Sequence, residues 1–92
     1  MKNEPIILPA DPADPEDFDV TAEALERGQR ARLIRQTRTE LGLSQSAFAT
    51  RFRVPVGTLR DWEQARVTPP DFAIACIRVI RLHPDMVATA VA

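Results

Sequence analysis

The stretch GLSQSAFATRFRVPVGTLRDWEQ, residues 42–64, decides which fold we predict for this chain of 92 residues. Ser44 is a favourable N-cap, and two phenylalanines spaced four residues apart follow it on one face of a short helix. Pro55 suits the start of a second helix, because the first turn of a helix does not use the amide proton that proline lacks. The stretch therefore predicts two short helices, 44–52 and 55–64, joined by a three-residue turn.

A helix is also expected before this stretch. Asp19 or Thr21 can cap a helix that begins at Ala22 and ends near residue 41, where Gly42 is a favourable stop. Gly28 interrupts the helix propensity and indicates a bend, or a separate element before it. Five arginines between residues 27 and 38 form a phosphate-facing surface, a partner surface or simply a solvated face.

Two more helices are expected after it. The Thr68-Pro69-Pro70 break precedes an apolar helix over 71–82, and a last short helix covers 85–91. No strand pattern occurs between residues 21 and 92. We predict an all-α fold, a compact helix-turn-helix bundle of about five helices, preceded by an extended, disordered acidic arm over 1–20.

The charge of the chain is unevenly distributed. Residues 1–26 carry eight acidic residues and one lysine, for a net charge of -7, whereas residues 27–92 carry eleven arginines and five acidic residues, for +6. This asymmetry suggests an acidic arm beside a nucleic-acid-binding domain. Prolines and low hydrophobicity predict that the arm is disordered. Its apolar triplet Ile6-Ile7-Leu8 predicts docking on a partner, and the alternative is an idle tail.

Several classes of protein are disfavoured by composition. The single cysteine, Cys76, allows no intramolecular disulfide and no cysteine-built zinc site. With one histidine, His83, no catalytic nucleophile, base and orienting group can be assembled. The apolar runs are too short to cross a bilayer, and no signal peptide is recognisable. We expect a cytoplasmic binding module that is not an enzyme and has no metal, cofactor or small-molecule substrate.

Residue types at fixed offsets resemble a known family. They are Arg38, Gly42-Leu43-Ser44-Gln45, Phe48-Ala49, Thr58-Leu59 and Trp62-Glu63-Gln64-Ala65-Arg66. Over residues 30–82 the chain resembles the lambda-repressor-like (XRE-type) helix-turn-helix family, whose second short helix enters the DNA major groove. The Trp-Glu-Gln ending, the following proline and the isoleucine-rich helix are similar to HigA-like antitoxins. That resemblance implies an antitoxin that neutralises a small basic ribonuclease-type toxin and represses its own operon.

The resemblance also implies which residues contact DNA. Gln45 would bridge a phosphate to the recognition helix, Val56 would contact a thymine methyl group and Arg60 would read guanine. Asp61 would accept from a cytosine amino group or orient an arginine, or it is simply paired with a neighbouring arginine. The full DNA-binding set is Arg38, Ser44, Gln45, Ser46, Pro55, Val56, Gly57, Thr58, Arg60, Asp61 and Arg66.

Structural roles are expected for other positions of the family pattern. Arg38 and Glu63 resemble the ion pair that joins the first helix to the recognition helix. Arg53 and Ala65 stand where the family usually has glycine. Either the turns differ there, or a positive φ adds strain of about 1 kcal/mol at each residue. Trp62 is expected in the core, and not stacked on a base, together with Ile34, Ala47, Phe48, Phe52 and Leu59.

The apolar C-terminal third is expected to serve both a core and a two-fold dimer. We predict that Phe72, Cys76, Ile77 and Ile80 point inward. Six other residues would face a second copy, namely Ile74, Val79, Leu82, Met86, Val87 and Val91. The alternative is that the whole segment is intramolecular core. Residues 21–92 thus form the DNA-binding domain with its dimerisation region.

A toxin would bind to the arm and the start of the first helix. The predicted contacts are Ile6, Ile7, Leu8, Phe18, Ala22, Leu25 and Glu26. Two other functions remain open: a stand-alone repressor without a toxin, and a protein-interaction adaptor that does not read DNA. Val56 and Gly57 favour the adaptor, because neither offers the amide side chain that often reads bases in this family.

Overall fold

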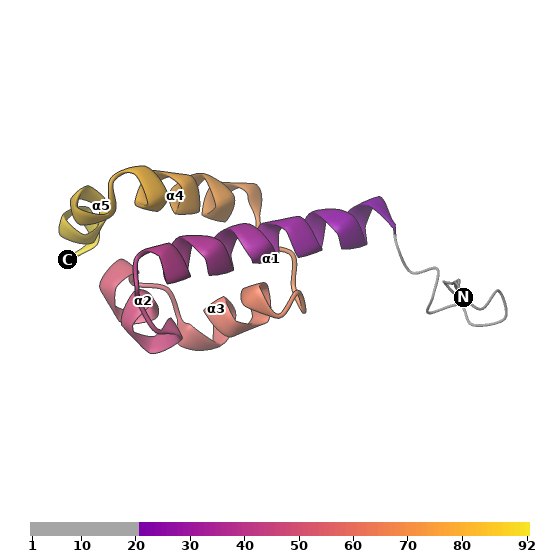
Figure 1. The fold of residues 1–92 in the computed structure, drawn as a ribbon, viewed down its shortest axis with the longest axis horizontal. Helices are drawn as coiled ribbons and strands as arrows, with labels where there is room; N and C mark the ends of the chain where they lie inside the picture. Colours follow the sequence, from indigo (N-terminus) through magenta and orange to yellow (C-terminus); the bar gives the residue numbers. More distant parts are fainter. Residues whose placement is uncertain (1–20) are drawn as a thin grey trace, which may run out of the picture.

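The fold is known from a computed structural model that describes residues 21–92. These residues form five α-helices and contain no strand, which confirms the predicted all-α helix-turn-helix bundle (Figure 1). The predicted arm, residues 1–20, lies outside the described residues. The helices are α1 (Ala22–Glu40), α2 (Gln45–Phe52), α3 (Val56–Glu63), α4 (Asp71–Leu82) and α5 (Pro84–Val91).

α1 is one continuous helix. Thr21, and not Asp19, is its N-cap, and the Thr21 side chain accepts a hydrogen bond of 3.0 Å from the amide of Ala24. The helix runs through Gly28 without interruption, so no separate element precedes that glycine. Buried side chains on the next turns hold the helix in place and outweigh the low propensity of one glycine. Gly42, with φ +71°, turns the chain away after the helix ends.

α1 lies between two pairs of helices. Figure 1 shows α2 and α3 on one side of it and α4 and α5 on the other, with the first turns of α1 projecting beyond both pairs. The core between them contains Ile34, Phe48, Leu59 and Ile77, all fully or almost fully buried. Burial of each such side chain contributes about 1.5–3 kcal/mol, which explains why α1 and the two pairs of helices stay packed together.

Two of the residues predicted for the core lie elsewhere. Ala47 is exposed, and Ala49 is the buried alanine of α2, because it shares a face with Phe48 and Phe52. Trp62 is half-buried and packs against the edge of the core. The phenylalanine pair is as predicted, with ring centroids 4.8 Å apart.

The two positions that lack the family's glycine keep a left-handed backbone. Arg53 has φ 61° and Ala65 has φ 57°. Each follows a short helix and closes it in the same way: the amide of Val54 donates to the carbonyl of Ala49, and the amide of Arg66 donates to the carbonyl of Asp61, both at 2.9 Å. A residue with a Cβ is strained in this conformation by about 1–2 kcal/mol.

Ala65→Gly is therefore expected to raise the free energy of unfolding by about 0.5–1 kcal/mol, since relief of the left-handed strain exceeds the entropy that glycine adds to the unfolded chain. Urea denaturation measures the change. Ala47→Gly is the matched control, because Ala47 is exposed on α2 and has a helical backbone. This substitution should lower the free energy of unfolding by about 1 kcal/mol, because glycine has the lower helix propensity. A destabilising Ala65→Gly would contradict the assignment of strain.

Candidate nucleic-acid interface

α2 and α3 are joined through residues 53–55, as the sequence predicts for a helix-turn-helix. Pro55 is the N-cap of α3, one residue outside the helix that it was expected to open, and its carbonyl accepts the 3.0 Å hydrogen bond from the amide of Leu59. Leu59 and Glu63 form the buried face of α3. The opposite face is open to solvent and is available to a DNA groove.

The residues predicted to read bases differ in how far they reach into solvent. Gly57 and Arg60 are exposed, whereas Val56 and Thr58 are half-buried. Val56 packs against the core, so only part of its side chain faces outward. A Cβ added to Gly57 would meet no atom within 4 Å, which means that this turn of α3 has free space in front of it.

Asp61 is paired within the protein. Its Oδ1 accepts a hydrogen bond of 3.2 Å from Nη1 of Arg66, a residue that follows α3. Both side chains are exposed by more than a third, so the pair contributes little to stability. Of the alternatives for Asp61, the structure contains the pairing with a neighbouring arginine.

The N-terminus of α2 offers amide groups to an anion. Ser44 accepts a hydrogen bond of 3.0 Å from the amide of Ala47 and caps the helix. The amides of Gln45 and Ser46 lie in the first turn, where a helix provides no acceptor for them. A DNA phosphate is a suitable acceptor at such a helix end.

Arg38, Glu63 and Gln45 form a hydrogen-bonded cluster that connects α1, α2 and α3. Arg38 donates to both carboxylate oxygens of Glu63, from Nε at 2.7 Å and from Nη2 at 2.9 Å, and donates from Nη1 to the carbonyl of Leu43. The side-chain Nε2 of Gln45 donates a hydrogen bond to Oε1 of Glu63 at 3.1 Å. The Glu63 hydrogen bonds raise the pKa of Arg38 above its usual value, although burial opposes this shift.

This cluster sets the position of α3. The side chain of Glu63 is only 3% exposed and that of Arg38 is 15% exposed. Each charge is therefore stabilised by its partner and not by water. Three of the five N–H groups of Arg38 are used within the protein. The geometry therefore favours a supporting role for Arg38, with Gln45 held where α2 meets the end of α3.

Arg35 is a supporting residue that the sequence reasoning did not single out. Its Nη1 donates to the backbone carbonyl of Glu63 at 2.9 Å, at the last residue of α3. The spacing of Arg35 and Arg38 by three residues places both on the side of α1 that faces α3. The five-arginine run was visible in the sequence, but nothing in it distinguished an arginine that holds α3 from one that is only solvated.

A comparison with protein families matches residues 28–90 to a family described as a helix-turn-helix domain. The chain belongs to this family. A search of curated proteins and a search of solved structures each found no match. The family match indicates a DNA-binding transcription regulator, in agreement with the exposed face of α3.

The C-terminal part of this helix-turn-helix domain corrects the predicted division between core and surface. Phe72 was predicted to point inward and is 72% exposed, and Cys76 is exposed as well. Ile74 was predicted to face a second copy and is buried in the core. Val87 is half-buried against the core. Ile77 and Ile80 are buried as predicted, and Val79, Leu82, Met86 and Val91 are exposed.

The reason for this exchange lies in the packing of α4 on α1. The helix is apolar nearly all round, so its periodicity alone does not select a buried face. In the structure Ala73, Ile74, Ile77 and Ile80 face the core, and this orientation turns Phe72, Cys76 and Val79 outward. The three outward residues are spaced by four and three positions and form one apolar stripe on α4.

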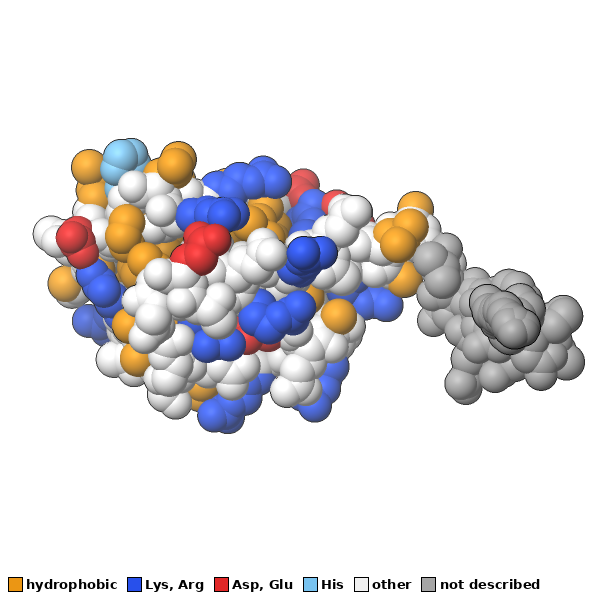
Figure 2. Space-filling model, viewed as in Figure 1, with side chains coloured by type: hydrophobic (Ala, Val, Ile, Leu, Met, Phe, Trp, Pro, Cys, Tyr) orange, Lys and Arg blue, Asp and Glu red, His pale blue; other side chains and the backbone are white. Residues whose placement is uncertain are grey.

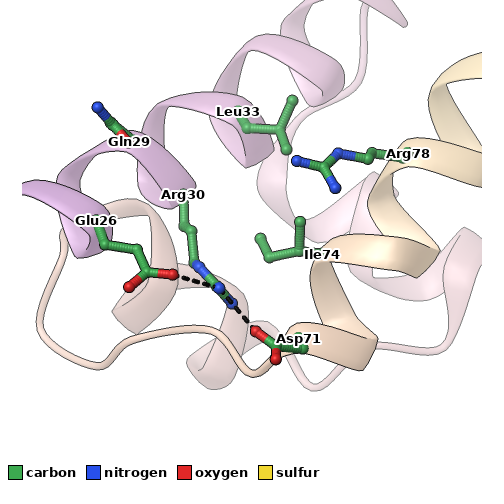
Figure 3. Close-up of a pocket in the computed structure, with 7 residues that line it drawn as sticks. All are labelled: Glu26, Gln29, Arg30, Leu33, Asp71, Ile74 and Arg78. Carbon is green, nitrogen blue, oxygen red and sulfur yellow. Dashed lines mark hydrogen bonds and ion pairs between the residues drawn. The ribbon is translucent and has the colours of Figure 1, made fainter. Parts of the chain in front are cut away.

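A pocket of about 450 Å³ lies between α1 and α4 (Figure 3). Arg30 spans it: the guanidinium contacts Glu26 on the same helix and Asp71 at the start of α4, the latter at 2.7 Å, and it also donates to the carbonyl of Pro69. The hydrogen bonds that Arg30 donates, first to Asp71 and second to Glu26, raise its pKa above the usual value. Glu26, a predicted toxin contact, thus pairs within α1 with the arginine whose other carboxylate partner, Asp71, lies on α4.

The remaining predicted toxin contacts are in two places. Ala22 and Leu25 are exposed on the projecting first turns of α1, whereas Ile6, Ile7, Leu8 and Phe18 lie outside the described residues. Within residues 21–92 no group of three potential metal ligands occurs. In the same residues no helix is long and apolar enough to span a membrane.

Proposed function

We propose that this protein is an antitoxin that represses its own operon and neutralises a small basic ribonuclease-type toxin. In this proposal residues 21–92 bind a palindromic operator as a dimer, and residues 1–20 bind the toxin. The observation that supports DNA binding is the solvent-exposed face of α3. The Arg38–Glu63 pair holds the opposite face of this helix against α1. The uneven charge of the chain supports the other half.

Arg60 tests the DNA-binding half. It is exposed on α3 and has no carboxylate partner within residues 21–92, so its guanidinium is available to the O6 and N7 acceptors of guanine. Arg60→Ala is expected to weaken operator binding about tenfold or more, and non-specific binding much less. Arg81→Ala, on α4, is the control for loss of one positive charge. Equal losses on both DNAs would remove Arg60 from base reading.

The arm tests the antitoxin half. The proposal predicts that the neighbouring reading frame encodes the toxin, as a small basic protein. Ile6→Ser, Ile7→Ser and Leu8→Ser together in the full chain should weaken binding of that product about 100-fold or more, because the complex would lose three aliphatic side chains that the toxin covers. Operator binding should not change. Val67→Ser, at an exposed valine, is the control. If the product does not bind the full chain, the stand-alone repressor is favoured.

The dimer uses the apolar stripe Phe72, Cys76 and Val79, together with exposed Leu82 and Met86 on the following turns. These side chains are large, apolar and open to solvent, and such a surface is a candidate interface between copies. Figure 2 shows hydrophobic side chains gathered at the end of the molecule that contains α5. Sedimentation of Phe72→Ser should show a monomer where the unmodified chain is a dimer, and a monomeric unmodified chain would contradict the proposal.

A further inference from the structure

The ion pairs of residues 21–92 use nearly every carboxylate in that part of the chain. Six acidic residues lie within 4.0 Å of an arginine, and Glu23 is the only other one. The paired residues are Glu26, Glu40, Asp61, Glu63, Asp71 and Asp85, which contact the arginines at 30, 38, 51, 66 and 81. Among the described residues almost no carboxylate therefore remains to pair with a further arginine.

Six arginines remain without a carboxylate partner among residues 21–92. They are Arg27, Arg32, Arg35, Arg53, Arg60 and Arg78. All are exposed except Arg27, which is half-buried. Figure 2 shows positive side chains spread over much of the visible face, with few negative ones between them.

Three of these six arginines lie in the helix-turn-helix or contact it. Arg60 lies on α3, Arg53 in the turn before it, and Arg35 contacts the carbonyl of the last residue of α3. Arg78 lies elsewhere, in the wall of the pocket between α1 and α4 (Figure 3). A polyanion that reaches these elements has arginines to contact on α1, in the turn and on α3.

The same chain contains an acidic segment, residues 1–20, that could contact these arginines. Residues 1–20 hold six carboxylates, Glu4, Asp11, Asp14, Glu16, Asp17 and Asp19, and one lysine. They are joined directly to Thr21, the N-cap of α1. Twenty residues can span up to about 66 Å when extended, which exceeds the length of α1, about 28 Å, more than twofold. Tethering gives the carboxylates an effective concentration on the order of millimolar.

We infer that residues 1–20 pair with the free arginines of their own domain, meaning those without a carboxylate partner among residues 21–92. There they compete with the phosphates of DNA. The inference rests on the proposed DNA binding. Each contact is solvent-exposed and weak, so the segment is held by its summed charge and not by one fixed geometry. Salt screens such contacts over about 8–10 Å, and DNA, with its denser charge, displaces the segment. Any basic partner that binds residues 1–20 would free the arginines for DNA.

The experiment uses the full chain with a neutralised segment: Asp11→Asn, Asp14→Asn, Glu16→Gln and Asp17→Asn together. The arginine Nε–Hε signals are recorded by NMR without DNA. We expect neutralisation to shift the signals of Arg32, Arg53 and Arg60. The signals of Arg38 and Arg30 should stay in place, because their guanidinium groups are already paired. Unchanged signals at the free arginines would overturn the inference. Shifts that depend on protein concentration would overturn its assignment to one chain.

DNA binding provides the second measurement. The neutralised chain should bind a non-specific duplex about tenfold more tightly at about 50 mM salt, with the difference shrinking towards about 200 mM. A chain with residues 4–19 in permuted order keeps its charge and should bind like the unmodified chain. Equal affinity of the neutralised and unmodified chains would overturn the competition. If neither chain binds DNA, the proposed function fails, while the NMR result still decides whether the segment contacts the arginines.

Discussion

Arg38→Met is expected to lower the free energy of unfolding by about 3 kcal/mol, the low end of the range for breaking a buried ion pair. Glu63, with a side chain only 3% exposed, would lose two hydrogen bonds from Arg38 and remain charged in the protein interior. Gln45 would still donate one hydrogen bond, which limits the loss. Chemical denaturation measures the effect as a lower midpoint at an unchanged slope.

Two further variants make this result specific. Arg81 pairs with Glu40 at 3.0 Å, but their side chains are 43% and 53% exposed, so Arg81→Met should cost at most about 1 kcal/mol. The double variant Arg38→Met with Glu63→Leu removes both buried charges and should recover much of the lost stability. A small loss for Arg38→Met, or no recovery in the double variant, would show that the pair does not hold α3 in place.

Gly57→Glu is expected to weaken DNA binding about 100-fold without unfolding the protein. Gly57 lies exposed in the first turn of α3, and a side chain added there meets no atom within 4 Å. A glutamate near a helix N-terminus is favourable for folding, because it interacts with the positive end of the helix dipole. Facing DNA, the same carboxylate approaches phosphates and base acceptors of like charge, which costs several kcal/mol in an interface.

Gly57→Ala separates the side chain from its charge. Alanine has the higher helix propensity, by up to about 1 kcal/mol, so this variant should be at least as stable as the unmodified chain. It should bind DNA within about tenfold of it, since one buried methylene-sized group is worth about 0.8 kcal/mol. Binding is measured by fluorescence anisotropy on a labelled duplex. If Gly57→Glu binds as tightly as Gly57→Ala, α3 does not face the DNA.

The helices themselves were predictable because their signals are local. The serine cap at residue 44, the proline at 55 and the spacing of the phenylalanines all act within a few residues, and the structure has α2 and α3 where they indicate. The Arg38–Glu63 pair was also expected, from the resemblance. The left-handed turns at Arg53 and Ala65 were an open alternative, because the strain of a single residue does not decide between two turn shapes.

The orientation of α4 was not predictable in the same way. Phe72 and Cys76 are exposed and Ile74 is buried, the reverse of the expectation, because a helix with apolar residues on every side has no preferred face until a neighbour covers one. Ala47 was wrongly expected in the core for a related reason, since it differs from the buried Ala49 only in the direction it faces.

The amino-acid sequence by itself determined five helical segments, the helix-turn-helix spacing and the separation of acidic from basic residues, because caps, helix breakers and formal charge do not depend on distant contacts. Only the tertiary structure decided which arginines are free. Arg30 and Arg81 each reach a carboxylate 41 residues away in the chain, and Arg38 reaches one 25 residues away. Such pairs form when packing brings helices together, and the arginines left over define the surface that remains for an anionic partner.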